Sequence, residues 1–118
     1  MKQIILLDDD DAIREIFPLL LNKAGFAVRV LTHGEEIVHQ SFEEPDLFII
    51  DKQLRGVSGL DVCRYLKQRS THQNTPVIII SASNKVEQAA MEAGADVFLE
   101  KPFKSAILID TIRKFTGS

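Results

Sequence analysis

The sequence predicts an α/β fold, in which helices cover both faces of a doubly wound five-stranded parallel sheet. Two observations support this prediction. Five short apolar runs alternate with longer amphipathic stretches along the chain, and the 118 residues suit one domain over residues 1–118. Strands that alternate with helices are joined by right-handed crossovers, which leave neighbouring strands parallel.

The five apolar runs are predicted to be buried strands. They are rich in Val, Ile, Leu and Phe and are too short for helices, which is typical of strands in a parallel sheet. They are Ile4–Leu7, Phe26–Leu31, Leu47–Ile50, Val77–Ile80 and Val97–Leu99. The second run contains Arg29, so we expect it at an edge of the sheet.

The stretch after the first run has the apolar period of a helix. Its apolar residues recur at helical offsets and form one stripe: Ile13, Ile16, Phe17, Leu20, Leu21 and Ala24. Gly25 follows as a stop signal. Pro18 cannot bond the Arg14 carbonyl and should cost about 3 kcal/mol, so we expect a bend there.

The other helices are predicted from their caps and apolar spacing. Two pairs have the spacing of a capping box and should open the second and third helices: Thr32 with Glu35, and Ser58 with Asp61. The fourth helix is expected to begin near Asn84 and to end before Gly94. The fifth is expected over about residues 105–115.

Composition and charge exclude several classes of protein. The chain has 14 Lys and Arg against 17 Asp and Glu, with no basic cluster, which argues against direct binding of nucleic acid. No apolar run is long enough for a membrane span or a secretory signal. The single cysteine, Cys63, cannot form an internal disulfide and fits the spacing of a helix core, so we expect a cytoplasmic protein.

Polar residues follow four of the five predicted strands. Asp8 and Asp9 follow the first run, Asp51 the third and Ser81 the fourth, and Lys101 comes just after the fifth. The carboxyl ends of parallel strands meet at one edge, where open α/β sheets bind ligands. We therefore expect three carboxylates, a hydroxyl and an ammonium group to converge there.

Such a cluster of carboxylates predicts a bound cation. Two carboxylates about 5 Å apart repel by roughly 3 kcal/mol at an effective dielectric constant near 20, and Lys101 offsets only part of this repulsion. Oxygen ligands without histidine or cysteine favour a hard ion such as Mg²⁺. A carboxylate beside the metal can act as a nucleophile and form an aspartyl phosphate.

Several motifs in this order give the chain a family resemblance. They are Asp8-Asp9, Leu47–Asp51, Ser58-Gly59, Ile80-Ser81-Ala82, Gly94-Ala95-Asp96 and Lys101-Pro102-Phe103. With them the whole chain resembles the receiver domains of bacterial two-component response regulators, including the chemotaxis regulators. The resemblance implies a flavodoxin-like fold with strand order 2-1-3-4-5 and five helices.

The resemblance also implies a role for each residue at the predicted edge. Asp51 would be the phosphoacceptor, and Mg²⁺ would be held by Asp8, Asp9, Asp51 and the backbone carbonyl of Gln53. Ser81 and Lys101 would bind the phosphoryl group. Ser81 and Phe98 would form the conformational switch, and the Lys101-Pro102 peptide would be cis.

The implied function is Mg²⁺-dependent transfer of a phosphoryl group to Asp51. The donor would be the phosphohistidine of a sensor histidine kinase or of a phosphotransfer protein. The change of conformation would then signal to an output partner that the sequence does not identify. The chain would catalyse only its own phosphorylation and dephosphorylation and is not expected to be an enzyme in the usual sense, nor to contact a membrane or nucleic acid directly.

Two departures from the family and three alternative functions bear on this interpretation. Arg55 stands where the family usually has proline, and the stretch from Ser81 to Gly94 is about two residues shorter, which weakens any transfer of an output surface. A pseudo-receiver that only binds other proteins remains the alternative. A hydrolase of the aspartyl-phosphate type is disfavoured because Gln53 replaces its second Asp, and a flavodoxin-like cofactor carrier because residues 8–11 would repel a phosphate.

Overall fold

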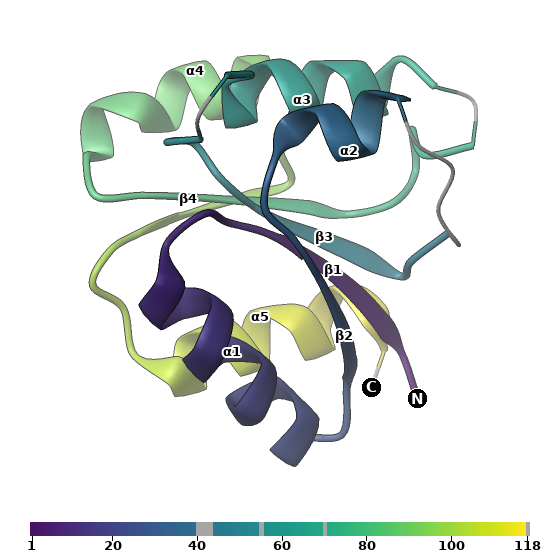
Figure 1. Ribbon diagram of the computed structural model, residues 1–118, viewed down its shortest axis with the longest axis vertical. Coiled ribbons are helices and arrows are strands. Elements are labelled where there is room, and N and C mark those ends of the chain that lie inside the picture. Colours follow the sequence, from purple (N-terminus) through teal and green to yellow (C-terminus); the bar gives the residue numbers. More distant parts are fainter. Residues whose placement is uncertain (40–43, 55, 70, 118) are drawn as a thin grey trace.

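The computed structural model describes residues 1–39, 44–54, 56–69 and 71–117 and has three layers, helices–sheet–helices (Figure 1). All neighbouring strands of the central sheet are parallel, in the order β2-β1-β3-β4-β5. The strands are β1 (Gln3–Leu7), β2 (Ala27–Leu31), β3 (Leu47–Asp51), β4 (Val77–Ser81) and β5 (Val97–Glu100). The predicted doubly wound sheet and its strand order are confirmed. Arg55, one of the two departures from the family pattern, lies outside the described residues.

Helices cover the sheet on both faces. They are α1 (Asp11–Lys23), α2 (Gly34–His39), α3 (Gly59–Lys67), α4 (Glu87–Glu92), preceded by a 3₁₀ turn over Asn84–Val86, and α5 (Ser105–Thr116). In Figure 1, α1 and α5 lie against one face of the sheet, and α2, α3 and α4 lie against the other. The predicted fourth helix is thus split into a 3₁₀ turn and a short α-helix.

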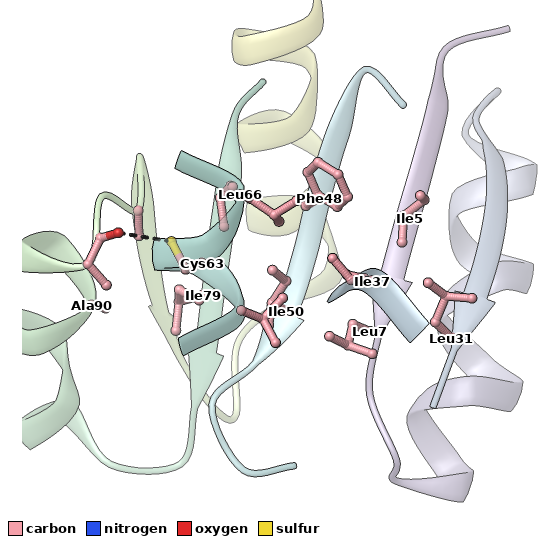
Figure 2. Close-up of a cluster of buried hydrophobic side chains, with 14 residues drawn as sticks. Ile5, Leu7, Leu31, Ile37, Phe48, Ile50, Cys63, Leu66, Ile79 and Ala90 are labelled. Carbon is pink, nitrogen blue, oxygen red and sulfur yellow. Dashed lines mark hydrogen bonds between the residues drawn. The ribbon is translucent and has the colours of Figure 1, made fainter. Parts of the chain in front are cut away.

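Side chains alternate between the two faces of each strand and form one core on each face. On the α1/α5 face, Ile4 and Ile49 pack with Leu21 of α1 and Ile112 of α5. On the opposite face, strand side chains pack against α2, α3 and α4 (Figure 2), with these residues labelled: Ile5, Leu7, Leu31, Ile37, Phe48, Ile50, Cys63, Leu66, Ile79 and Ala90. Every residue of β3 and β4 is buried, whereas Arg29 on the edge strand β2 is exposed, as predicted.

Cys63 lies inside this second core, as its helical spacing predicts. Its Sγ lies 3.5 Å from the Ala93 carbonyl oxygen, to which it can donate. Burial raises the pKa of the Cys63 thiol to about 11, which disfavours the reactive thiolate. We therefore assign Cys63 a packing role.

Helix α1 begins at a side-chain cap and continues through Pro18. The Asp10 carboxylate accepts hydrogen bonds from the backbone N–H groups of Ala12 (2.9 Å) and Ile13 (3.2 Å), as an N-cap does. The expectation of a single buried stripe is only partly right. Leu21 is fully buried, but Ile16 is 52% exposed, so the apolar stripe is wider than the face that contacts the sheet.

The predicted capping box at α2 is wrong by one residue. The helix begins at Gly34, and the side chain of Glu36 rather than Glu35 accepts from the backbone N–H groups of Thr32 (2.9 Å) and His33 (3.0 Å). Burial acts to raise the pKa of the Glu36 carboxyl, but these hydrogen bonds lower it by more. The pKa of Glu36 therefore lies below its ordinary value.

At α3 the predicted N-cap is correct and its partner is not. The Ser58 hydroxyl accepts from the Leu60 N–H at 3.2 Å. Asp61 does not return a bond to Ser58 and instead pairs with Arg64, whose NH1 lies 2.7 Å from the Asp61 carboxylate.

A partly exposed contact joins α3 to the amino ends of β4 and β5. The Lys67 ammonium donates to the Thr75 carbonyl (2.8 Å) and to the Asp96 carboxylate (2.9 Å). The same Asp96 oxygen accepts from the Val77 N–H at 2.8 Å. This end of the sheet is therefore tied to the end of α3.

The helices within residues 1–39, 44–54, 56–69 and 71–117 are all too short or too polar to cross a bilayer.

The burial pattern of α1 predicts opposite outcomes for two neighbouring leucines. Leu21→Ala should lower the free energy of unfolding by about 2–5 kcal/mol, because it leaves a cavity in the core. Leu19→Ala, at a side chain that is 70% exposed, should change it by about 0.5 kcal/mol or less. Urea unfolding followed by circular dichroism measures both, and equal losses would contradict this orientation of α1.

Candidate functional site

Backbone hydrogen bonds hold the residues that follow the strands at one edge of the sheet. The Asp8 N–H donates to the Leu31 carbonyl (3.1 Å), and the Lys101 N–H donates to the Ser81 carbonyl (2.8 Å). The Lys52 N–H, directly after Asp51, donates to the Ile80 carbonyl (2.9 Å). The ladder thus continues past the strand ends and fixes the backbone from which the polar side chains extend.

Three of the predicted side chains meet directly. The Lys101 ammonium lies 2.9 Å from Oδ2 of Asp51 and 3.7 Å from Oδ2 of Asp8. Both carboxylates are buried, and the Lys101 side chain is only 23% exposed. Asp8, Asp51 and Lys101 are at least 43 positions apart in the sequence. They nevertheless form one charged cluster.

Backbone amides hold one oxygen of each carboxylate. Oδ1 of Asp8 accepts from the Asp10 N–H at 2.8 Å, and Oδ1 of Asp51 accepts from the Gln53 N–H at 3.0 Å. Aspartate often accepts a hydrogen bond from the amide two residues later in the chain, as both residues do here. These bonds orient both carboxylates.

Asp8 is the less well paired of the two buried carboxylates in this cluster. Its Oδ2 is buried and has no hydrogen-bond partner among the described residues. Burial raises the pKa of the Asp8 carboxyl to about 6, and the nearby Asp51 carboxylate also raises it, whereas the Asp10 N–H and Lys101 oppose the shift. Among the described residues, the Lys101 ammonium is thus shared by two buried carboxylates.

Ser81 and Phe98 occupy neighbouring strands close to this cluster. Ser81 is buried, and its Oγ accepts from the Ser83 N–H at 3.1 Å, which leaves the hydroxyl proton able to donate elsewhere. Phe98 is opposite Ile79 on β4 and packs, half-buried, against the core on the α3 face. The Lys101-Pro102 peptide is cis.

Asp9 is placed differently from Asp8. It is half-buried and lines a polar cleft of about 260 Å³ together with Asp11, Arg14, Thr32 and His33. Within the described ranges, no three carboxylate, imidazole or thiol side chains are grouped so as to hold one metal ion. The role of Asp9 as a metal ligand therefore stays a prediction.

The described residues nevertheless suit a hard divalent cation. The buried Oδ2 of Asp8 lacks a hydrogen bond and lies near a second carboxylate, so a cation there would supply the missing partner. The available donors are oxygens, which Mg²⁺ prefers. The observation that supports the fit is this buried oxygen, which has no hydrogen bond from the described residues, rather than the number of acidic residues.

An apolar hollow beside the charged cluster was not predicted. It has a volume of about 450 Å³, and its lining comes from α1 and from the segments after β4 and β5: Ile13, Phe17, Ala82, Lys101, Pro102 and Phe103. Phe17 and Phe103 meet edge to face with their ring centroids 5.9 Å apart. The ring pair joins α1 to the segment that carries Lys101.

Comparison with protein families and curated proteins gives consistent matches. The family model described as the response regulator receiver domain matches residues 4–113. The transcriptional regulatory protein CseB of Streptomyces coelicolor is 37% identical over 114 residues, which cover 93% of this chain and 47% of that protein. The response regulator MprA of Mycobacterium leprae is 34% identical, with coverages of 94% and 49%. The chain thus spans about half the length of these relatives.

Solved structures share the fold over almost the whole chain. The signal receiver domain of a signal transduction histidine kinase from Syntrophus aciditrophicus has a TM-score of 0.91 and 26% identity, and the match covers 99% of this chain and 91% of that one. The receiver domain of the sensor histidine kinase PA1611 from Pseudomonas aeruginosa, with magnesium coordinated in its active-site cleft, has a TM-score of 0.90 and 22% identity, with coverages of 99% and 98%.

The raised pKa of Asp8 predicts that Asp8→Asn stabilises the metal-free protein. The folded protein binds the Asp8 proton more tightly than the unfolded chain, because the pKa rises from 3.8 to about 6. Stability should therefore fall as pH rises from about 4 to 6, and at pH 7 the ionised group should cost up to about 3 kcal/mol.

We expect Asp8→Asn to recover up to about 3 kcal/mol at pH 7 in EDTA and to flatten the dependence of stability on pH between about 4 and 6. Urea unfolding at several pH values measures both effects. Asp110→Asn, at an exposed position of α5, is the matched control. A variant less stable than the unaltered chain in EDTA would show that Asp8 is not destabilised by its surroundings.

Proposed function

Because this chain belongs to the response regulator receiver domain family, we propose that it is the phosphoacceptor domain of a two-component phosphorelay and that Asp51 receives the phosphoryl group. The observation that carries the proposal is the position of Lys101, whose ammonium lies 2.9 Å from Oδ2 of the buried Asp51 carboxylate. A nucleophilic carboxylate beside a fixed cation is what phosphoryl transfer to aspartate requires.

In the proposed step, a carboxylate oxygen of Asp51 attacks the phosphorus of a phosphohistidine. A P–O bond forms, the P–N bond breaks, and its electron pair goes to the imidazole nitrogen of the donor. Lys101 pairs with the transferred anion, and the Gln53 N–H holds Oδ1 of Asp51 in a fixed direction. The Ser81 hydroxyl donates a hydrogen bond to a phosphoryl oxygen.

We propose that Asp8, Asp9, Asp51 and the backbone carbonyl of Gln53 hold Mg²⁺. When bound, this ion neutralises charge on the phosphoryl oxygens. Support comes from the unpaired Oδ2 of Asp8 and from the magnesium in the active-site cleft of the PA1611 receiver domain. The carboxyl of Asp8 must be ionised to serve as a ligand, which its pKa of about 6 permits at neutral pH.

The response to phosphorylation is proposed to begin at Ser81 and to reach Phe98. A bond from the Ser81 hydroxyl to the new phosphate would draw the start of the β4–α4 segment toward Asp51. Phe98 lies on the adjacent strand β5 and packs, half-buried, against the core on the α3 face. Its ring can therefore change position as the β4–α4 segment moves. The chain itself would catalyse only its own phosphorylation and dephosphorylation.

The partners in the proposal are a sensor histidine kinase or phosphotransfer protein and an output partner not yet identified. The expectation that nucleic acid is not contacted directly concerns residues 1–118 alone. MtrA of Mycolicibacterium smegmatis, a DNA-binding response regulator, is about twice as long as the part matched by this chain. DNA binding by a longer protein that contains this domain is therefore compatible with the proposal.

A pseudo-receiver that acts only as an interaction module is the second candidate. A receiver that no longer accepts phosphate need not preserve the acceptor, the lysine and the hydroxyl in one buried cluster. Here Asp51, Lys101 and Ser81 are all present at the same edge. These residues favour a phosphorylated receiver.

Removal of the acceptor carboxylate should abolish phosphorylation. Incubated with acetyl phosphate or phosphoramidate and Mg²⁺, the unaltered chain should gain about 80 Da by intact-mass spectrometry. Asp51→Asn should gain nothing, because an amide is not a nucleophile for phosphorus, and EDTA should prevent the gain in the unaltered chain.

Asp110→Asn serves as the control and should be modified like the unaltered chain, since Asp110 lies exposed on α5. Equal modification of Asp51→Asn would refute Asp51 as the acceptor. No modification of the unaltered chain by either donor would favour the pseudo-receiver.

A further inference from the structure

Gly59 is the buried first residue of α3 and lies against the backbone that carries Asp51. A β-carbon at this position would overlap the Asp51 carbonyl oxygen and would lie 2.8 Å from both the Asp51 carbonyl carbon and the Lys52 α-carbon. These neighbours are backbone atoms of the sheet edge, which cannot rotate away as a side chain can. Close approach of two backbones therefore requires glycine here.

A hydrogen bond at the same point closes the β3–α3 loop at its base. The Gly59 N–H donates to the Lys52 carbonyl at 3.1 Å. On the other side, the Lys52 N–H donates to the Ile80 carbonyl of β4 at 2.9 Å. Lys52 is thus held on both sides, through its N–H to β4 and through its carbonyl to the first residue of α3.

Gln53 follows directly after this fixed point. Its N–H holds Oδ1 of Asp51 at 3.0 Å, and its carbonyl is the proposed backbone ligand for Mg²⁺. The direction of both groups depends on where Lys52 is placed. A side chain on Gly59 would displace Lys52 and turn both groups together.

We propose that Gly59 is a positioning residue for the metal site, whose backbone contact with Asp51 and Lys52 sets the directions of the Asp51 carboxylate and the Gln53 carbonyl. The inference rests on the proposed function, because it assigns these two groups to Mg²⁺. Residues that orient metal ligands without touching the ion typically change metal affinity by about 10- to 100-fold when replaced.

Gly34 provides a matched control. It is the buried first residue of α2, and a β-carbon there would lie 2.9 Å from Cγ2 of Val62 and 3.0 Å from Cβ of Val57. The space around Gly34 is also tight, although less so than at Gly59, and its nearest neighbours are side chains rather than the acceptor backbone. Gly34→Ala therefore adds a β-carbon at the first residue of a neighbouring helix without contact with Asp51 or Lys52.

The test compares Mg²⁺ affinity with stability in the unphosphorylated protein. Isothermal titration with MgCl₂ should show about tenfold weaker binding for Gly59→Ala, and affinity within about twofold of the unaltered chain for Gly34→Ala. Both variants should unfold at lower urea concentrations. Equal Mg²⁺ affinity in the two variants would overturn the inference while leaving the proposed function intact, provided that the unaltered chain binds Mg²⁺ and is phosphorylated.

Hydrogen exchange on the unaltered chain tests the same contact if Gly59→Ala does not fold. The Gly59 amide bonds to Lys52, and the Val62 amide, in the same turn of α3, bonds to the Ser58 carbonyl at 3.1 Å. Mg²⁺ should slow exchange of the Gly59 amide several-fold more than that of the Val62 amide, because only the former bond lies in the metal loop. Equal slowing of both amides would overturn the inference.

Discussion

The Lys101 ammonium lies close to two buried carboxylates and pairs with them unequally. The rest of the site is arranged around this ammonium group. Asp51 lies 2.9 Å from the ammonium, whereas Asp8 lies 3.7 Å from it and has one oxygen that accepts no hydrogen bond from the part of the chain that the structure describes. Burial of an ionised carboxylate is expensive unless it is paired. Among the described residues, the two buried carboxylates therefore carry more negative charge than the one ammonium group offsets, and a divalent cation would neutralise the excess.

The parallel sheet imposes this pairing because it brings every carboxyl end to one edge. Backbone bonds beyond the strand ends then place Asp8 beside β2 and Lys101 beside β4, so the side chains start from fixed positions. The same buried strands leave little room for the backbone to relax the repulsion. The fold and the charges that it brings together thus both favour a site for a cation and a phosphoryl group. This is consistent with the match to the receiver domain family.

The strands and three of the clustered residues could be predicted because their signals are local. Continuous apolar runs identify buried strands. Asp8 and Asp51 follow such runs directly, and Lys101 follows one after a single residue. The start of α2 could not be predicted to the residue, because Glu35 and Glu36 are both suitable cap residues and the sequence alone does not distinguish them. The outward position of Ile16 and the close contact at Gly59 depend on tertiary packing and leave no periodic signal.

The salt bridge between Lys67 and Asp96 has a mechanical consequence for the opposite end of the sheet. It joins α3 to the amino ends of β4 and β5, with the Val77 N–H on the same carboxylate oxygen. The amino ends of β4 and β5 are therefore tied to α3, and β4 is buried along its whole length. A response to a chemical change at the charged cluster is thus left to the segments that follow Ser81 and Glu100, because the strands themselves are held in place.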